Sequence, residues 1–291
     1  MIDRPGLELS AHDAPSWQAE GPLAVRALHI ARRVAGFLAR DGAEPRPARF
    51  AIHRAAPEHA GLGTGTQLSL AVARILAERA GRPVRTAAAL ADLTGRGRRS
   101  GIGLHGFVRG GLIVDGGRRN PEGVPPLLCS LEFPSEWSVL VVLPPAPPGL
   151  HGPDEVQAFE GLPSLSDALT DRLCRLVLLG LLPAVVERDL DRFGAALSEL
   201  QHRVGLGFAP AQGGPYALPA LGAIVTWLRA EGLHGVGQSS WGPALYGFSQ
   251  DPADRRASLL ARLQDRFGLG PPATFWAAAS PRGAALENDE G

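Results

Sequence analysis

The spacing of apolar residues predicts an alternation of helices and short strands. Between residues 21 and 39, apolar side chains recur every three or four positions, which is typical of a helix with one buried face. Phe50 and Ile52 alternate with small or polar neighbours and predict a short strand. The glycine-rich run 61–67 leads directly into a second helical pattern over Leu68–Leu76. The predicted order is therefore strand, glycine loop, helix.

The rest of the chain continues this alternation. Residues 1–20 are polar and are expected to be irregular, apart from a strand at Leu7–Leu9. Thr86 can cap a short helix that runs through Leu93, and Val108–Asp115 suggests a strand pair. The other predicted elements are strands at Val139–Leu143, Leu245–Phe248 and Thr274–Ala278, helices at Pro219–Ala230 and Pro252–Phe267, and a helical region over residues 165–204 that is interrupted near Pro183.

A run of prolines marks the expected domain boundary. Pro144-Pro145-Ala146-Pro147-Pro148 is stiff and cannot pair in a sheet, as expected of a connection between domains. The sequence therefore predicts an N-terminal domain over residues 1–143 and a C-terminal domain over residues 144–291.

Composition and charge are those of a folded protein. Of 291 residues, 45% are hydrophobic and 20% are charged, which excludes the usual composition of a disordered chain. The net charge of +0 provides no global field for nucleic acid or an anionic membrane, so neither is an expected partner. No apolar stretch reaches the ~20 residues of a membrane span, and no signal peptide is visible. Cys129 and Cys174 lack CxxC spacing and are expected to be free thiols, so a cytoplasmic location is expected.

The basic residues are all of one kind. The sequence contains no lysine, so its 29 basic residues are all arginine. Any anionic ligand must therefore be held by Arg, His, backbone N–H groups or a metal ion, because no ammonium group from a Lys side chain is present.

The run Gly61–Thr66 carries the strongest chemical signal. Where a glycine-rich turn enters a helix, several backbone N–H groups point towards one place and can bind an anion. Gly63 and Gly65 are expected to adopt positive φ, while Thr64 and Thr66 add hydroxyl donors. Hydrogen bonds to a charged group contribute roughly 1.5–3 kcal/mol each, which favours a phosphate or diphosphate. The alternative is a tight structural turn, and the run matches neither a Walker A loop nor a dinucleotide fingerprint.

A second glycine-rich segment spans residues 95–107. Its Arg98, Arg99 and His105 suit a phosphorylated, anionic substrate. The alternatives are a solvated surface turn for the two arginines and an ordinary hydrogen-bonded histidine for His105.

A third glycine-rich segment spans Gly235–Pro243. Gln238, Ser239 and Ser240 offer neutral hydrogen-bonding groups, and Trp241 offers a flat apolar face. These properties suit an aromatic substrate or a sugar, and the alternative is a core tryptophan beside a turn.

Carboxylates also follow the proline run. Asp154 and Glu155, just after His151, are candidates for binding a metal ion or for acid–base work. The first turn of a helix explains them equally well.

These segments, taken in order, resemble those of a known superfamily. Pro57-x-x-x-Gly61-Leu62-Gly63-Thr64-Gly65-Thr66 is similar to the phosphate-binding motif of GHMP small-molecule kinases. With His59 before it and Gln67 after it, and with Arg98–Phe107 and Gly237–Pro243, it more closely resembles the β-ribofuranosylaminobenzene 5′-phosphate synthase branch. The resemblance implies the GHMP-kinase-like α+β fold, with a mixed-sheet N-terminal domain and a ferredoxin-like C-terminal domain. The active site is expected between the domains, where the three segments meet.

The resemblance also implies a reaction. It is the transfer of the ribosyl 5-phosphate group of phosphoribosyl diphosphate to 4-aminobenzoate or 4-hydroxybenzoate, with loss of CO2 and diphosphate, an early step towards tetrahydromethanopterin. Mg2+ is expected, no organic cofactor is required, and a homodimer is implied. The implied site comprises phosphate-binding Gly61, Gly63, Thr64, Gly65 and Thr66, catalytic Arg98, Arg99, His105 and Asp115, and substrate-binding His59, Gln67, Ser100, Gly101, Gly103, Gln238, Ser239, Ser240 and Trp241.

Two further functions stay open. In GHMP kinases a Pro-Ser-Gly-x-Asp-like stretch supplies an acid, and matching Ser100-Gly101 to it places Gly103 where that acid would lie. Glycine has no side chain that acts as a base, so an ATP-dependent kinase is disfavoured unless Asp115 compensates. The other alternative is a non-catalytic ligand-binding relative. It is raised because Met1–Gly6 resembles an internal point of the family pattern, so that an opening strand with an Arg-x-His-like stretch is expected to be missing.

Overall fold

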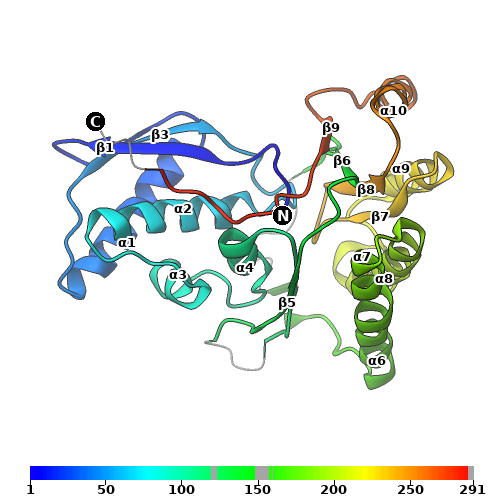
Figure 1. Ribbon diagram of the computed structural model, residues 1–291, viewed down its shortest axis with the longest axis horizontal. Coiled ribbons are helices and arrows are strands. Elements are labelled where there is room, and N and C mark those ends of the chain that lie inside the picture. The colour runs from blue at the N-terminus through cyan, green and yellow to red at the C-terminus, as the bar shows by residue number, and fades with distance from the viewer. Residues whose placement is uncertain (119–122, 148–156, 159, 288–291) are drawn as a thin grey trace. The chain divides into compact units, whose positions relative to one another are not determined.

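The computed structural model describes residues 1–118, 123–147, 157–158 and 160–287 (Figure 1). Contacts divide the chain into two compact units. Unit 1 contains Met1–Pro57, Gly63–Glu132 and the C-terminal segment from Ser280, and unit 2 contains Glu58–Leu62 and Phe133–Ala279. Within the described ranges, no helix is long and apolar enough to cross a membrane.

The main sheet of unit 1 has three strands in the order β1-β3-β2, namely β1 (Glu8–Asp13), β3 (Ala48–Arg54) and β2 (Gln18–Glu20). β1 is antiparallel to β3, and β2 is parallel to it. The parallel pair is joined through helix α1 (Ala24–Arg40), which was predicted. The prediction that residues 1–20 are irregular apart from Leu7–Leu9 was wrong beyond Leu9, because β1 continues to Asp13 and β2 follows it. Only Leu9 and Ala11 of β1 pack on the core, so apolar and polar residues alternate too weakly for the strand to be predicted.

Helices form the rest of unit 1. α2 (Thr64–Arg79) follows the glycine loop as predicted, and its Leu68 and Leu76 pack in one core with Phe50 of β3. α3 (Ala87–Thr94) begins where expected, with the Thr86 hydroxyl oxygen accepting a hydrogen bond from Ala89 N at 3.3 Å. In Figure 1 the sheet formed by β1 and β3 lies over α1 and α2.

The second glycine-rich segment differs from its prediction. Helix α4 (Ile102–Arg109) occupies part of the region expected to be a strand pair, and β4 (Leu112–Asp115) pairs instead with β5 (Leu127–Leu131). Gly110 and Gly111 lie between them with φ of 74° and 66°. These left-handed residues end α4 and turn the chain into β4, as glycine permits.

The C-terminal segment returns to unit 1 and runs along α4 and β4. Gly111 N donates to Ser280 O at 2.7 Å, and Ala284 N donates to Phe107 O at 2.7 Å. Arg74 of α2 donates to Ala284 O at 2.6 Å. The last described residues therefore contribute to the fold that holds the second glycine-rich segment.

Unit 2 contains a four-stranded antiparallel sheet in the order β7-β8-β6-β9, namely β7 (His234–Gln238), β8 (Leu245–Ser249), β6 (Ser138–Val142) and β9 (Thr274–Ala277). With helices between β6 and β7 and between β8 and β9, the order is βαββαβ, which confirms the ferredoxin-like expectation. Because β6 pairs inside this sheet, the contacts divide the chain before β6 rather than at the proline run.

The helices of unit 2 cover this sheet. α6 (Asp167–Leu176) runs through the π-helical turn η1 (Val177–Leu181) into α7 (Leu182–Val186), so the interruption predicted near Pro183 is present. Leu140 and Leu245 of the sheet pack with Leu228 in one core. The remaining helices are α8 (Leu190–Gln212), α9 (Pro219–Ala230) and α10 (Ala253–Phe267).

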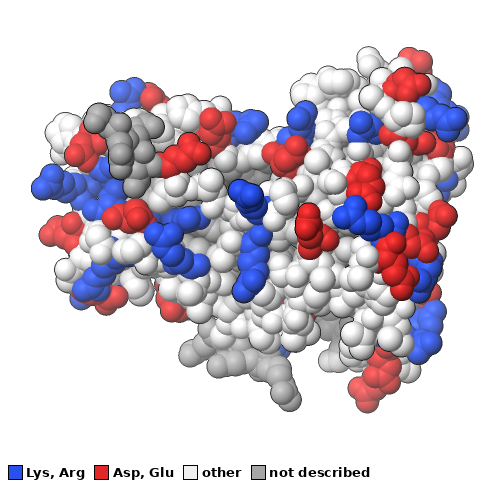
Figure 2. Space-filling view, viewed as in Figure 1, with Lys and Arg blue, Asp and Glu red and all other residues white. Residues whose placement is uncertain are grey.

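Charged residues of both signs are interspersed over the face drawn in Figure 2, in keeping with the net charge of +0.

Helices α6 and α8 are linked by a charge cluster. Arg172 donates two hydrogen bonds of 2.8 Å to the two oxygens of Glu199, and Arg203 donates a third of 2.9 Å. The bonds from Arg172, followed by those from Arg203, lower the pKa of the Glu199 carboxyl from its ordinary value of 4.5.

This cluster predicts a pH-dependent contribution to stability. Because the pKa of Glu199 is lower in the folded protein than in the unfolded chain, its stabilisation is present above pH about 4.5 and is lost as pH falls through the folded-state pKa. Glu199→Gln is therefore expected to lower the unfolding temperature at pH 7, with the difference from wild type vanishing in acid. Asp171→Asn, on the exposed side of α6, is the control. An equal difference at all pH values would contradict this account.

Candidate active site

The first glycine-rich run is shared between the two units. His59 and Gly61 belong to unit 2, while Gly63, Thr64 and the following residues belong to unit 1. The surroundings of each part are therefore described within its own unit.

In unit 1 the run forms the start of α2. Gly63 is the N-cap residue with φ of 70°, as predicted, and its carbonyl accepts from Thr66 N at 3.0 Å and Gln67 N at 3.1 Å. The first N–H groups of a helix have no acceptor within that helix and carry a partial positive charge, which suits an anion. The Thr64 hydroxyl donates to Pro57 O at 2.9 Å. The Thr64 hydroxyl proton is therefore used in a hydrogen bond within the loop. Phosphate binding by Thr66 and by the backbone amides stays a hypothesis.

Gly65 departs from its predicted conformation. It lies inside α2 and is absent from the positive-φ residues, so backbone freedom is not its role. A Cβ atom at Gly65 would lie 2.4 Å from Nη2 of Arg26, a residue of α1. Glycine therefore leaves room for the guanidinium group of Arg26 beside the helix backbone.

The second segment meets the first within unit 1. A Cβ atom on Gly103 would lie 3.1 Å from Cγ2 of Thr66, and Gln67 donates a hydrogen bond of 3.1 Å from Nε2 to Gly103 O. Two of the predicted substrate-binding residues, Gln67 and Gly103, are thus brought together beside the start of α2.

Asp115 holds the first turn of α4 in place. One carboxylate oxygen accepts from Gly101 N at 2.7 Å and from Ser100 Oγ at 3.1 Å, and the other accepts from Gly117 N at 3.1 Å. A carboxylate at a helix N-terminus satisfies unpaired N–H groups and is stabilised by the helix dipole. This arrangement gives Asp115 a positioning role, and its predicted catalytic role stays a hypothesis.

His105 is oriented by a backbone contact. Its Nε2 lies 2.8 Å from Pro125 O, so Nε2 carries the proton and donates to that carbonyl. A Cβ atom at Gly101 would lie 2.9 Å from both Nε2 and Pro125 O, which explains glycine at that position. Arg98 and Arg99 are exposed on the loop before α4.

The third segment meets the first within unit 2. Ser239 donates from Oγ to Gly61 O at 2.7 Å, and Ala244 N donates to Ala60 O at 3.1 Å. Gly61 has φ of 86°, and its Cβ position would lie 2.6 Å from Ser239 O. The two segments therefore approach each other through backbone atoms.

The polar residues of the third segment mainly support its own turn. Gln238 is buried, accepts from Ala217 N at 2.7 Å through Oε1, and donates to Ser240 O at 3.0 Å through Nε2. Trp241 is only 4% exposed, and the centroid of its ring lies 4.6 Å from the ring centroid of Phe208. Its burial matches the alternative of a core tryptophan, so contact between Trp241 and a substrate stays a prediction.

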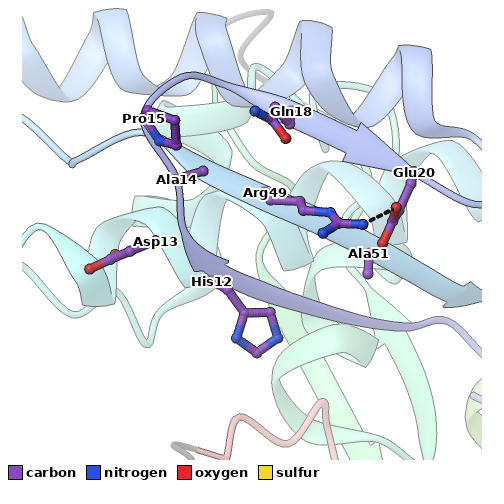
Figure 3. Close-up of a pocket in the computed structure, with 8 residues that line it drawn as sticks. All are labelled: His12, Asp13, Ala14, Pro15, Gln18, Glu20, Arg49 and Ala51. Carbon is purple, nitrogen blue, oxygen red and sulfur yellow. Dashed lines mark hydrogen bonds and ion pairs between the residues drawn. The ribbon is translucent and has the colours of Figure 1, made fainter.

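Two surface hollows lie away from these segments. One of about 400 Å³ lies on the sheet of unit 1, where His12, Gln18, Glu20 and Arg49 surround it and Glu20 pairs with Arg49 (Figure 3). Another of about 370 Å³ lies in unit 2 beside Asp189 and His234. Neither contains a predicted site residue. The candidate site is therefore defined by the close contacts that the glycine-rich segments make within each unit, and not by these hollows.

A metal site is not formed by the described residues. Across residues 1–118, 123–147, 157–158 and 160–287, no group of three His, Cys, Asp or Glu side chains could hold a metal ion. The candidates Asp154 and Glu155 lie outside the described residues.

Comparison with known families decides the assignment. The model of the GHMP kinase N-terminal domain matches residues 23–111, and that of the GHMP kinase C-terminal domain matches residues 181–267. The chain is 31% identical to the β-ribofuranosylphenol 5′-phosphate synthase of Methanothermobacter thermautotrophicus over 98% of this chain and 85% of that protein. It belongs to the family of these synthases. The synthase of the same name from Archaeoglobus fulgidus is 33% identical over 87% of this chain and 79% of its own length.

Solved structures confirm the fold of this synthase family member. Homoserine kinase from Cytophaga hutchinsonii superposes with a TM-score of 0.65, at 15% identity, over 97% of this chain and 88% of that one. Mevalonate diphosphate decarboxylase from Enterococcus faecalis gives a TM-score of 0.62, at 15% identity, over 95% and 85% of the two chains. The predicted GHMP-kinase-like α+β fold and the resemblance to the synthase branch are both confirmed.

The contact between Gly61 and Ser239 predicts a large effect of a small side chain. Gly61→Ala adds a methyl group 2.6 Å from Ser239 O at a positive φ, and is expected to lower the free energy of unfolding by at least ~1–2 kcal/mol. Gly81→Ala is the matched control, because Gly81 has φ of 69° and nothing within 4 Å of its Cβ position. Urea denaturation measures both, and equal losses would show that φ alone matters.

The position of Asp115 predicts a loss of stability separable from catalysis. Asp115→Ala removes the acceptor for Gly101 N and Ser100 Oγ, and is expected to cost about 1–2 kcal/mol of unfolding free energy. Asp115→Asn keeps one acceptor oxygen and should cost less. Asp92→Ala, an exposed acid on α3, is the control. Unchanged stability of Asp115→Ala with lost turnover would instead establish a catalytic role.

Proposed function

We propose that this protein joins phosphoribosyl diphosphate to 4-hydroxybenzoate or 4-aminobenzoate, with loss of CO2 and diphosphate. The observation that carries the proposal is 31–33% identity, over most of the chain, to two proteins named β-ribofuranosylphenol 5′-phosphate synthase. A phenol is what 4-hydroxybenzoate becomes when its carboxylate leaves as CO2, so those names favour 4-hydroxybenzoate as the acceptor. The reaction would be an early step towards tetrahydromethanopterin.

The bonds balance without an oxidant or reductant. The C1–oxygen bond of the ribose breaks and its electrons leave with diphosphate. The ring carbon that carries the carboxylate forms a bond to C1. The carbon–carboxylate bond then breaks, its electrons restore the aromatic ring, and CO2 departs. The protein must therefore stabilise diphosphate as it leaves and hold the ring against C1.

The first of these tasks suits unit 1. The amides at the start of α2 and the hydroxyl of Thr66 offer donors to phosphate oxygens. Arg98 and Arg99 are exposed on the loop before α4 and offer positive charge to the leaving diphosphate. His105, whose Nε2 donates to Pro125 O, keeps Nδ1 as an acceptor in its neutral form.

Holding the aromatic acid is assigned to the third segment. Gln238 and Ser239 fix the shape of this segment through hydrogen bonds to Ala217 N, Ser240 O and Gly61 O, and Trp241 packs beneath it against Phe208. His59 lies two residues before Gly61 in the run that meets this segment. The buried position of Trp241 makes its role one of shaping the segment.

The phosphates of the substrate are better ligands for Mg2+ than the side chains of the described residues. The structure described as MDDEF in complex with MVAPP, AMPPCP and Magnesium has the same fold as this chain, with a TM-score of 0.62. Within the described residues no acidic cluster can hold the ion, and Asp115 is engaged by backbone amides. Mg2+ usually binds substrate phosphates with few protein ligands, so we propose that it accompanies the diphosphate. No organic cofactor is proposed, and a cytoplasmic homodimer remains part of the proposal.

A kinase is the less favoured function. Gly103 occupies the position expected for the acid of a kinase, and a Cβ atom there would make a tight contact of 3.1 Å with Cγ2 of Thr66. Asp115 is bound to the first turn of α4 and to Gly117 N. The names of the relatives likewise favour a synthase.

Turnover of purified protein tests the proposal. The protein is incubated with phosphoribosyl diphosphate, Mg2+ and either carboxyl-labelled 4-hydroxybenzoate or 4-aminobenzoate, and released CO2 and diphosphate are measured. Equal amounts of both products with one acid are expected. A parallel reaction with ATP and candidate alcohols is the control. Consumption of ATP without CO2 release would establish a kinase, and binding without turnover of any substrate would establish a ligand-binding relative.

A further inference from the structure

One side chain joins the first two glycine-rich segments within unit 1. Gln67 lies in the first turn of α2, where its backbone N–H donates to Gly63 O at 3.1 Å. Its side chain extends to the second segment, and Nε2 donates to Gly103 O at 3.1 Å. All three residues belong to unit 1. Gln67 is therefore fixed to the first segment by its backbone and to the second segment by its amide group.

This hydrogen bond holds Gly103 close to Thr66. From the Cβ position of Gly103, Cγ2 of Thr66 lies at 3.1 Å and Nε2 of Gln67 at 3.7 Å. Gly103 lies inside helix α4 and is absent from the residues with positive φ, so its backbone conformation is one that alanine adopts readily. The glycine therefore leaves room for Thr66 and Gln67 beside the first turn of α4.

The contact with Gly103 affects the hydroxyl group of Thr66. Threonine is branched at Cβ, so its methyl group and its hydroxyl group turn together about χ1. With the methyl carbon Cγ2 beside Gly103, the direction of the hydroxyl group depends on where α4 lies. Gln67 keeps α4 in that place with a partly buried hydrogen bond.

The second segment is also held on the side away from α2. Asp115 of β4 accepts from Gly101 N at 2.7 Å, and Nε2 of His105 lies 2.8 Å from Pro125 O. These contacts orient α4 relative to β4 and to the chain before β5. The hydrogen bond from Gln67 adds the orientation of α4 relative to α2.

We infer that Gln67 is a positioning residue, which keeps Gly103 beside Thr66 and so directs the Thr66 hydroxyl group towards a phosphate oxygen of the substrate. The inference rests on the proposed function, in which Thr66 binds phosphate. It assigns Gln67 a contact with the protein in place of the contact with substrate that the family resemblance implies. The phosphate belongs either to the diphosphate or to the 5-phosphate of the sugar.

A double-mutant cycle tests the inference without requiring turnover. Titration calorimetry measures the affinity of wild type, Gln67→Met, Thr66→Val and the double variant for Mg2+-diphosphate and, separately, for ribose 5-phosphate. Each single variant is expected to weaken one of these ligands about tenfold, because the Thr66 hydroxyl group is turned away or removed. The double variant should bind as Thr66→Val does, because Gln67 acts only through Thr66. The ligand that is weakened identifies which phosphate Thr66 holds.

Two more variants separate positioning from direct contact with the ligand. Gln67→Glu keeps the length and an acceptor oxygen but cannot donate to Gly103 O when ionised, so it should behave as Gln67→Met does. Gly103→Ala keeps both side chains and presses on Cγ2 of Thr66, so it should weaken the same ligand.

The matched controls lie away from this contact. Gly36→Ala is inside α1 with nothing within 4 Å of its Cβ position, and Gln18→Met removes an exposed amide from β2. Both are expected to bind as wild type does. Circular dichroism at the temperature of the titration shows that each variant is folded.

The outcomes separate this inference from the proposed function. A loss of affinity in Gln67→Met that disappears in the Thr66→Val background supports the inference even if wild type makes no product, in which case only the proposed reaction fails. A loss that persists in that background, to about a hundredfold in the double variant, overturns the inference because Gln67 then acts on the ligand independently of Thr66. Wild-type affinity in Gln67→Met or Gly103→Ala, or no binding of either ligand by wild type, also overturns it, whether or not turnover occurs.

Discussion

Glycine at three positions leaves room for neighbouring groups to lie close to the backbone, between 2.4 and 3.1 Å from where a Cβ atom would be. Gly61 admits the backbone of Ser239, Gly65 admits the guanidinium group of Arg26, and Gly103 admits the side chain of Thr66. Each approach lies within one unit, and each brings a different segment to the run. Within unit 1 the second segment meets the start of α2 through Gly103, and within unit 2 the third segment meets Gly61 through Ser239. Glycine loses more conformational entropy on folding than other residues, so the arrangement has a cost in stability.

Part of this structure follows from local patterns. The strand, glycine loop and helix from Ala48 to Arg79 were predicted because apolar periodicity, glycine and the helix stop all lie within about thirty residues. Three of the four strands of unit 2 and its helices were predicted for the same reason, but β7 was not, because its glycine-rich sequence was interpreted as part of a turn. The ferredoxin-like order of those strands was implied by the family resemblance instead, because pairing between distant segments leaves no local signal.

Other parts were set by tertiary contacts and were not predicted. Helix α4 contains two glycines, so its sequence is a poor helix former, but Asp115 satisfies its first turn and Phe107 packs in the core. Arg26 lies far from the glycine run in sequence and reaches it only because α1 packs on α2. Trp241 is a residue type that is common in binding surfaces, but its burial against Phe208 makes it part of the interior. In each case the partner, rather than the residue, decides the role.

The C-terminal segment has a consequence for the order of events during synthesis. Ala284 and Ser280 pair with Phe107 and Gly111, so α4 and β4 gain these hydrogen bonds only after residues about 170 positions later have left the ribosome. Glu58–Leu62 likewise belongs to unit 2, whose sheet is completed by β9. Neither unit can therefore finish folding as an independent N-terminal or C-terminal half, although domains of larger proteins often fold one after the other as they emerge. Helix α4 and strand β4 therefore complete their hydrogen bonds only after Ser280 and Ala284 have been synthesised.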